Sequence, residues 1–217
     1  MESNPELELA WQLVEYTGVN VFLTGKAGSG KTTFLRSLRE RSTKRMVVLA
    51  PTGVAAMNAG GVTIHSFFQL PFAPFVPESH FGGEAKYQYR FGKEKVNILR
   101  SLDLLVIDEI SMVRADLLDS VDDVLRRYRD RHKPFGGVQL LMIGDLQQLS
   151  PVVKEQDQQL LSPYYDYFYF FGSHALAQAG YVTVELTKVY RQSNAEFLNL
   201  LNCIRDNRVD ASVLNRL

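Results

Sequence analysis

The chain has 217 residues, 46% of them hydrophobic and 22% charged, which suits one well-packed core or one domain with a small insert. Its 24 basic and 24 acidic residues balance, and no apolar run is long enough to span a membrane, so neither a nucleic-acid-coating protein with one basic face nor a membrane protein is expected. The single cysteine, Cys203, excludes an internal disulfide and a cysteine zinc cluster and favours a reducing, cytoplasmic setting.

Short apolar runs rich in Val, Ile and Leu recur along the chain and are typical of strands buried on both faces. They cover Val19–Leu23, Met46–Ala50, Leu102–Ile107, Leu140–Ile143 and Tyr181–Leu186. Helical patterns fall between them, at Thr32–Arg41, Gly53–Ala59, Arg114–Arg131 and His174–Gln178. This alternation predicts an α/β domain with a mostly parallel central sheet, in which ligands bind at the carboxyl ends of the strands.

The segment from Gly25 to Thr32 reads GKAGSGKT and follows the first predicted strand directly. It fits the G-x-x-x-x-G-K-[ST] pattern, whose glycines let backbone N–H groups turn toward a phosphate at the start of a helix. We expect Lys31 to reach the β- and γ-phosphates and the Thr32 hydroxyl to hold Mg²⁺. The complete set of predicted nucleotide contacts in this segment is Gly28, Ser29, Gly30, Lys31, Thr32 and Thr33.

Polar residues that suit ATP hydrolysis follow the later strands. Asp108 comes directly after the strand that ends at Ile107 and is expected to hold Mg²⁺, while Glu109 is placed to orient or deprotonate the attacking water. Gln148, preferred over its neighbour Gln147, is expected to sense the γ-phosphate, and Arg191, after the last strand, to reach it. Each of these has a plainer alternative, namely a helix cap for the acids, a polar loop for the glutamine and a salt bridge for the arginine.

Two aromatic-rich segments invite different interpretations. Residues 71–97 break the alternation with several prolines, glycines and aromatics and a basic second half, which indicates an inserted loop or small subdomain. Residues 164–171 carry seven aromatics in eight positions, and we expect them to pack under a helix that begins near Ser173 rather than to bind bases.

Five segments resemble, in order, motifs I, Ia, II, III and IV of superfamily-one DNA helicases. They are VFLTGKAGSGKTT, LAPTGVAAMNAGGVTIHSFF, LLVIDEISMV, GGVQLLMIGDLQQLSPVV and LTKVYRQ, and they span about residues 19–192. Any one of them is moderately specific, but five in this order are strongly so. The nearest resemblance is to the PIF-type (petite integration frequency) group, close to RecD-like enzymes.

The resemblance implies a RecA-like P-loop NTPase domain over residues 1–217, the first of two motor domains, with a small wedge-like insert at about 71–97. It implies a monomer that uses ATP and Mg²⁺ to unwind DNA in the 5′-to-3′ direction and has single-stranded DNA as its partner. The implied catalytic set is Lys31, Glu109, Gln148 and Arg191, and the implied DNA track consists of Thr52, Gly53, Thr63, His65 and Phe67. The residues alone favour a core pair for His65 and Phe67; the resemblance reverses that preference.

Three questions stay open. The motifs of a second motor domain are absent from the sequence, so we expect weak or no ATP turnover by these residues alone. A nucleotide- and DNA-binding fragment is therefore the alternative, and a different P-loop ATPase or small-molecule kinase is a third. The adenine contact is undecided between Asn4 and Gln12.

Overall fold

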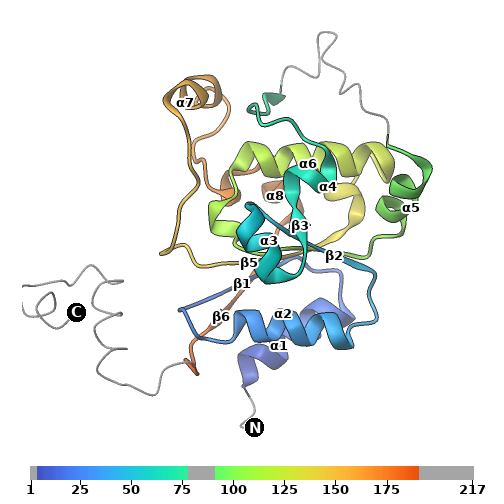
Figure 1. Cartoon of the computed structure of the whole chain (residues 1–217), viewed down its shortest axis with the longest axis vertical. Helices are drawn as coiled ribbons and strands as arrows, with labels where there is room; N and C mark the ends of the chain where they lie inside the picture. The colour runs from blue at the N-terminus through green and yellow to red at the C-terminus, as the bar shows by residue number, and fades with distance from the viewer. Residues whose placement is uncertain (1–3, 78–90, 191–217) are drawn as a thin grey trace, which may run out of the picture.

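The computed structural model describes residues 4–77 and 91–190 and centres on a six-stranded sheet (Figure 1). All pairings between neighbouring strands are parallel, and the order across the sheet is β3-β2-β4-β5-β1-β6. The strands are β1 (Val21–Gly25), β2 (Met46–Ala50), β3 (Val62–Thr63), β4 (Leu104–Ile107), β5 (Gln139–Ile143) and β6 (Val182–Leu186). The predicted α/β class with a parallel central sheet is confirmed.

Helices cover both faces of this sheet. Figure 1 places α1 and α2 on one face, and α4, α5, α6 and α8 on the other. The helices are α1 (Pro5–Tyr16), α2 (Lys31–Arg41), α3 (Gly53–Ala59), α4 (Ile64–Phe68), α5 (Lys93–Ser101), α6 (Ala115–Tyr128), α7 (Glu155–Leu161) and α8 (His174–Ala179). Three short 3-10 turns complete the described elements: η2 (Ile110–Met112), η3 (Pro134–Gly137) and η4 (Phe170–Gly172).

The central strands separate two hydrophobic cores by simple alternation. In β4, Leu104 and Val106 belong to the core beneath α1 and α2, whereas Leu105 and Ile107 belong to the core beneath α6. All four are fully buried. This is why these strands are continuous apolar runs, since a strand covered on both faces has no side left for water.

The predicted strands and helices are present, with ends that differ from the prediction by three residues at most. The first helix, α1, was not predicted, although Asn4 caps it by accepting hydrogen bonds from the N–H groups of Glu6 and Leu7, and Pro5 opens it. The other elements missed are β3, α4, α5 and α7, all nine residues or shorter. Helix α5 lies largely within the predicted insert, and residues 78–90 of that insert lie outside the described residues.

The aromatic run at 164–171 packs in part as predicted, since two of its rings are buried while Tyr167 and Phe171 are exposed. Tyr165 and Phe170 are buried, and Ser173 caps α8 through a hydrogen bond that its hydroxyl accepts from the Leu176 N–H. The buried carboxylate of Asp119, on α6, ties this segment down by accepting hydrogen bonds from the Tyr165 hydroxyl, the Ser173 hydroxyl and two N–H groups at the start of α8. Burial and this carboxylate raise the pKa of Tyr165, which keeps the hydroxyl protonated as a donor.

Replacing Asp119 with alanine should lower the free energy of unfolding by about 3 kcal/mol, because several buried donors lose their acceptor together. Asp123→Ala is the matched control: Asp123 lies on the same helix, pairs with Arg127 near the surface, and its loss should cost less than about 1 kcal/mol. Urea unfolding followed by circular dichroism measures both. Equal losses would contradict the role given to Asp119.

Candidate active site

The phosphate loop lies between β1 and α2 and depends on glycine. Gly25, Gly28 and Gly30 have positive φ angles of 149°, 80° and 102°. A Cβ at Gly25 would lie 2.7 Å from the Leu186 carbonyl oxygen and 2.8 Å from the Ser29 hydroxyl, so no larger residue fits there. Gly30 caps α2 without a side chain, which leaves the first-turn N–H groups of this helix available to an anion.

The polar side chains of the loop point inward. The Lys31 ammonium donates hydrogen bonds to the Gly25 carbonyl (2.5 Å) and the Lys26 carbonyl (3.2 Å), so the side chain lies across the loop. The Ser29 hydroxyl is fully buried and has no hydrogen-bond partner among the described residues. A buried hydroxyl of this kind normally has a partner, which fits a loop built to surround phosphate oxygens. Thr32 and Thr33 follow on the exposed first turn of α2.

Asp108 and Glu109, the acidic pair, lie directly after the end of β4. The Glu109 N–H donates to the Asp108 carboxylate at 3.1 Å, and Glu109 itself has a left-handed φ of 52°. Burial raises the pKa of Asp108, with the Glu109 N–H and Lys31 opposing. Burial and then the Asp108 charge raise the pKa of Glu109, Lys31 lowers it, and Asp145 raises it slightly. The ends of β1, β4 and β5 thus bring a lysine and three carboxylates into one electrostatic group.

Asp145, two residues after the end of β5, orients the predicted sensor Gln148. It is buried and accepts hydrogen bonds from the Gln147 N–H (3.1 Å) and from the Gln148 side-chain amide (3.0 Å). Gln148, the glutamine preferred from sequence, is therefore the one whose side chain is held in place. Asp145 was missed from sequence, although its position two residues after a buried strand is close to the signal that singled out Asp108.

Gly144 lets the loop after β5 pack directly on the turn that follows the acidic pair. A Cβ at Gly144 would lie 2.9 Å from the Ile110 side chain and 3.2 Å from the backbone nitrogens of Ile110 and Ser111. The two loops are therefore in close backbone contact. Because of this contact, η2 and the segment from Asp145 to Gln148 pack against each other without an intervening side chain at position 144.

The described residues contain no cluster of three His, Cys, Asp or Glu side chains able to hold a metal by themselves. Mg²⁺ is instead commonly bound through one or two carboxylates together with nucleotide phosphates and water. Thr32 and Asp108 fit that pattern, since the hydroxyl opens the helix beside the phosphate loop and the carboxylate is electrostatically coupled to Lys31.

Tyr190 and Asn4 are linked by hydrogen bonds to the phosphate loop. The Tyr190 N–H donates to the Gly28 carbonyl at 2.9 Å, and the Asn4 side-chain amide donates to the Tyr190 hydroxyl at 2.9 Å. Gln12 instead bonds Glu8 on the exposed side of α1. Of the two adenine candidates, only Asn4 is linked to the loop. Arg191, the next residue in the chain, lies outside the described residues.

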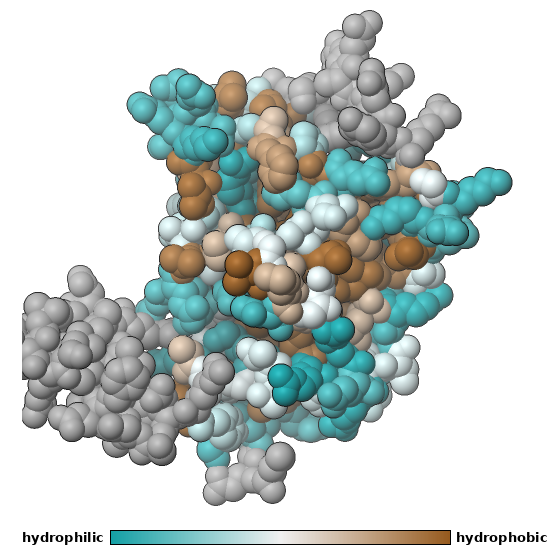
Figure 2. All heavy atoms as spheres, in the orientation of Figure 1, coloured by the Kyte–Doolittle hydropathy of each residue, from teal (hydrophilic) through white to brown (hydrophobic). Residues whose placement is uncertain are grey.

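The predicted DNA-track residues lie around α3 and α4. Thr52 and Thr63 cap these helices, each hydroxyl accepting a hydrogen bond at 3.2 Å from an N–H three residues on. Gly53 is the first residue of α3, and its Cα faces open space. Figure 2 shows apolar residues in the middle of this face, where Figure 1 places α3 and β3. Val54 and Met57 of α3 contribute exposed apolar surface.

Phe67 does not belong to that surface, which corrects its implied place in the DNA track as a ring on which a base could stack. It is 8% exposed and packs in the core beneath α6, edge-on to Phe68 at 4.9 Å. The Lys95 ammonium lies 3.1 Å above its ring centroid and covers the remaining face. The reason is the short helix α4, which turns Ile64, Phe67 and Phe68 toward the sheet together.

His65 stays at the surface but not as a cation. It is half-buried and stacks on Phe72, with ring centroids 4.8 Å apart and planes 24° from parallel. Burial lowers the pKa of His65, and the nearby Arg114 charge lowers it further against a weaker opposing effect of Asp116. An imidazole's ordinary pKa already lies below 7, so this lowering favours the neutral form at pH 7, which has no charge to attract phosphate.

The raised carboxyl pKa of Glu109 gives a prediction for stability. When folding raises the pKa of a carboxyl group, ionisation of that group opposes folding. The resulting loss of stability is complete at a pH above the folded-state pKa and absent at a pH below the unfolded-state pKa. Without nucleotide, Glu109→Gln should therefore melt at a higher temperature than the wild type at pH 7.5, with a smaller difference at pH 5. Calorimetry measures this, with Glu40→Gln on the exposed end of α2 as control; a pH-independent difference would contradict it.

None of the described helices is both long and apolar enough to cross a bilayer. Curated proteins similar to this chain include ATP-dependent DNA helicases. The ATP-dependent DNA helicase PIF1 of Homo sapiens is 39% identical over 206 residues, covering 92% of this chain and 29% of that protein. The ATP-dependent DNA helicase Pif1 of Bdellovibrio bacteriovorus is 35% identical over 216 residues, covering 98% and 45%.

Among solved structures, Pif1 helicase from Bacteroides in complex with ADP-AlF3 and ssDNA matches with a TM-score of 0.91 and 48% identity. The match covers 99% of this chain and 49% of that one, so the chain spans about half of its solved relative and less than half of the curated ones. The model of the PIF1-like helicase family matches residues 8–213. The chain therefore belongs to the PIF1-like helicase family.

Proposed function

We propose that this chain is the ATP-hydrolysing motor domain of a DNA helicase that moves 5′ to 3′ along single-stranded DNA. One observation carries the proposal: the phosphate loop, the Asp108–Glu109 pair and the Asp145–Gln148 pair meet at the carboxyl ends of three parallel strands. The Bacteroides relative, which binds ADP-AlF3 and ssDNA, supports both ligands for this chain.

Nucleotide binding falls to the loop and the start of α2. The first-turn N–H groups and the inward Lys31 side chain would hold the phosphates, and the lysine would exchange the Gly25 and Lys26 carbonyls for phosphate oxygens. Thr32 and Asp108 would hold Mg²⁺, which supplies positive charge to the β- and γ-phosphate oxygens when bound. Asn4 and Tyr190 are proposed to border the nucleotide base, because their hydrogen bonds link them to the Gly28 carbonyl of the phosphate loop.

Glu109 and its neighbours are proposed to carry out hydrolysis. Its carboxylate would accept a proton from the attacking water, and the pKa raised by burial makes it a stronger base than an exposed glutamate. The Lys31 charge opposes this shift and favours the ionised form of the carboxylate. Gln148, oriented by Asp145, would contact the γ-phosphate or the water, and Arg191 is proposed to add a further positive charge there.

The second candidate is a module that binds nucleotide and single-stranded DNA with little turnover by these residues alone. The observation in its favour is that the chain matches only about half of the solved relative, so residues of the other half would be needed to close on the γ-phosphate. The family match leaves no support for a small-molecule kinase.

Two substitutions separate binding from chemistry. Glu109→Gln should bind nucleotide like the wild type but lower any ATP turnover by roughly 10²–10⁴-fold, the usual contribution of a general base. Lys31→Ala should lose most of the nucleotide binding and most of the ATP turnover. Lys93 is an exposed lysine on α5, and Lys93→Ala should change neither binding nor turnover. Binding is measured with a fluorescent ATP analogue, and turnover by phosphate release with and without single-stranded DNA.

The outcomes assign the function. Full turnover by Glu109→Gln would refute its role as the base. Tight nucleotide and DNA binding by the wild type without phosphate release would favour the second candidate. Unchanged nucleotide binding by Lys31→Ala would contradict both candidates.

A further inference from the structure

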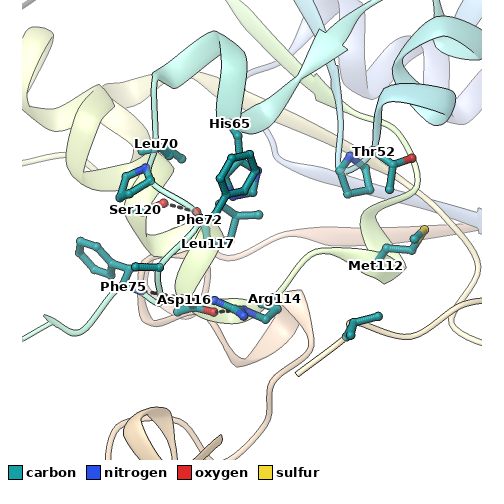
Figure 3. Close-up of a pocket in the computed structure, with 14 residues that line it drawn as sticks. Thr52, His65, Leu70, Phe72, Phe75, Met112, Arg114, Asp116, Leu117 and Ser120 are labelled. Carbon is teal, nitrogen blue, oxygen red and sulfur yellow. Dashed lines mark hydrogen bonds and ion pairs between the residues drawn. The ribbon is translucent and has the colours of Figure 1, made fainter. Parts of the chain in front are cut away.

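Phe72 is the most exposed large apolar side chain of the described residues, at 87%. In Figure 3 its ring overlaps that of His65, which covers one face. The other face is open to solvent, and burying such a ring is normally favourable. The pair lines a pocket of about 240 Å³ together with Pro51 and Thr52, which lie at the start of α3. Phe72 is therefore stacked on one face only, and its open face can accept another flat ring.

The segment that carries Phe72 is anchored at its other end. The Arg114 guanidinium forms two hydrogen bonds of 2.8 Å with the buried Asp116 carboxylate, which in turn accepts one from the Phe75 N–H at 3.0 Å (Figure 3). Arg114 also donates to Asp157 of α7 at 3.0 Å. We call Arg114, Asp116 and Asp157 the clamp. It fixes the chain three residues after Phe72 and so limits where the ring can lie.

The stack has the chemistry of a base platform rather than of a phosphate site. His65 is neutral because burial and the neighbouring Arg114 lower its pKa. The Arg114 charge is engaged by two carboxylates, at 2.8 Å and 3.0 Å. An uncharged, flat and rigidly backed ring favours another flat ring, and a nucleobase of any identity offers one.

We propose that Phe72 takes over the role first given to Phe67 and binds a nucleobase of single-stranded DNA, which stacks on its open face while His65 supports the other. The clamp acts as the positioning element. This inference rests on the proposed function, since it names a contact within the DNA track next to Thr52. It differs from a phosphate contact because its energy comes from ring overlap and not from charge.

The test combines a change in the protein with a change in the DNA. Binding of a fluorescein-labelled oligothymidylate is measured by anisotropy for the wild type, Phe72→Ala, Phe72→Trp and the control Tyr16→Ala, which removes another exposed aromatic side chain, at the end of α1. Each protein is also measured with oligonucleotides that lack one base, at every position in turn. Salt titrations accompany all of them.

Phe72→Ala should weaken binding roughly tenfold, in the range expected for one stacked base, and leave the dependence on salt unchanged. Phe72→Trp should restore the affinity, and Tyr16→Ala should match the wild type. One missing base should cost the wild type a similar factor and cost Phe72→Ala nothing further. Nucleotide binding should be the same in all four proteins.

Two results would overturn the inference while leaving the proposed function intact. One is salt-dependent DNA binding that Phe72→Ala does not weaken; the other is a loss without coupling to any single base. A lower salt dependence in Phe72→Ala would also overturn it, since that change marks a phosphate contact. No DNA binding by the wild type would overturn the inference and the proposed function together.

Discussion

The burial of β4 and β5 on both faces is the constraint on which the site depends. These neighbouring parallel strands are apolar along almost their whole length, so their polar neighbours in sequence are placed at the strand ends. Because parallel strands end at the same edge, Asp108 and Asp145 are brought together, and β1 adds the phosphate loop beside them. The core thus fixes the relative positions of three loops that are far apart in the chain. Gly144 completes this arrangement by allowing two of the loops to touch.

This arrangement places several carboxylates in a partly buried site with one lysine. Burial raises the pKa of both Asp108 and Glu109, so their ionised forms oppose folding, although the proposed function needs these forms to bind Mg²⁺ and to accept a proton. Such a conflict between stability and function is common at active sites. The buried Ser29 hydroxyl without a described partner belongs to the same pattern, because its partner would arrive with the ligand.

The strands could be predicted from sequence because a strand buried on both faces leaves a continuous apolar run. The phosphate loop and the acidic pair could be predicted because their residue types follow such runs directly. Helix α4 could not, since five residues are too few to establish a helical period. The residues alone favoured a core position for Phe67, which the structure confirms, and it was the family resemblance that moved this side chain to the DNA track. Phe72 belongs to no motif, and only the stack on His65 reveals it. Asp145 could have been predicted in the same way, because it lies two residues after a buried strand.

A crystal structure of this chain with an ATP analogue and Mg²⁺ tests the central claim most directly. We expect the phosphates at the first-turn N–H groups of α2, the Lys31 ammonium moved from the Gly25 carbonyl to a phosphate oxygen, and the metal between Thr32 and Asp108. A nucleotide bound elsewhere, or an Asp108 carboxylate turned away from the metal, would contradict the account.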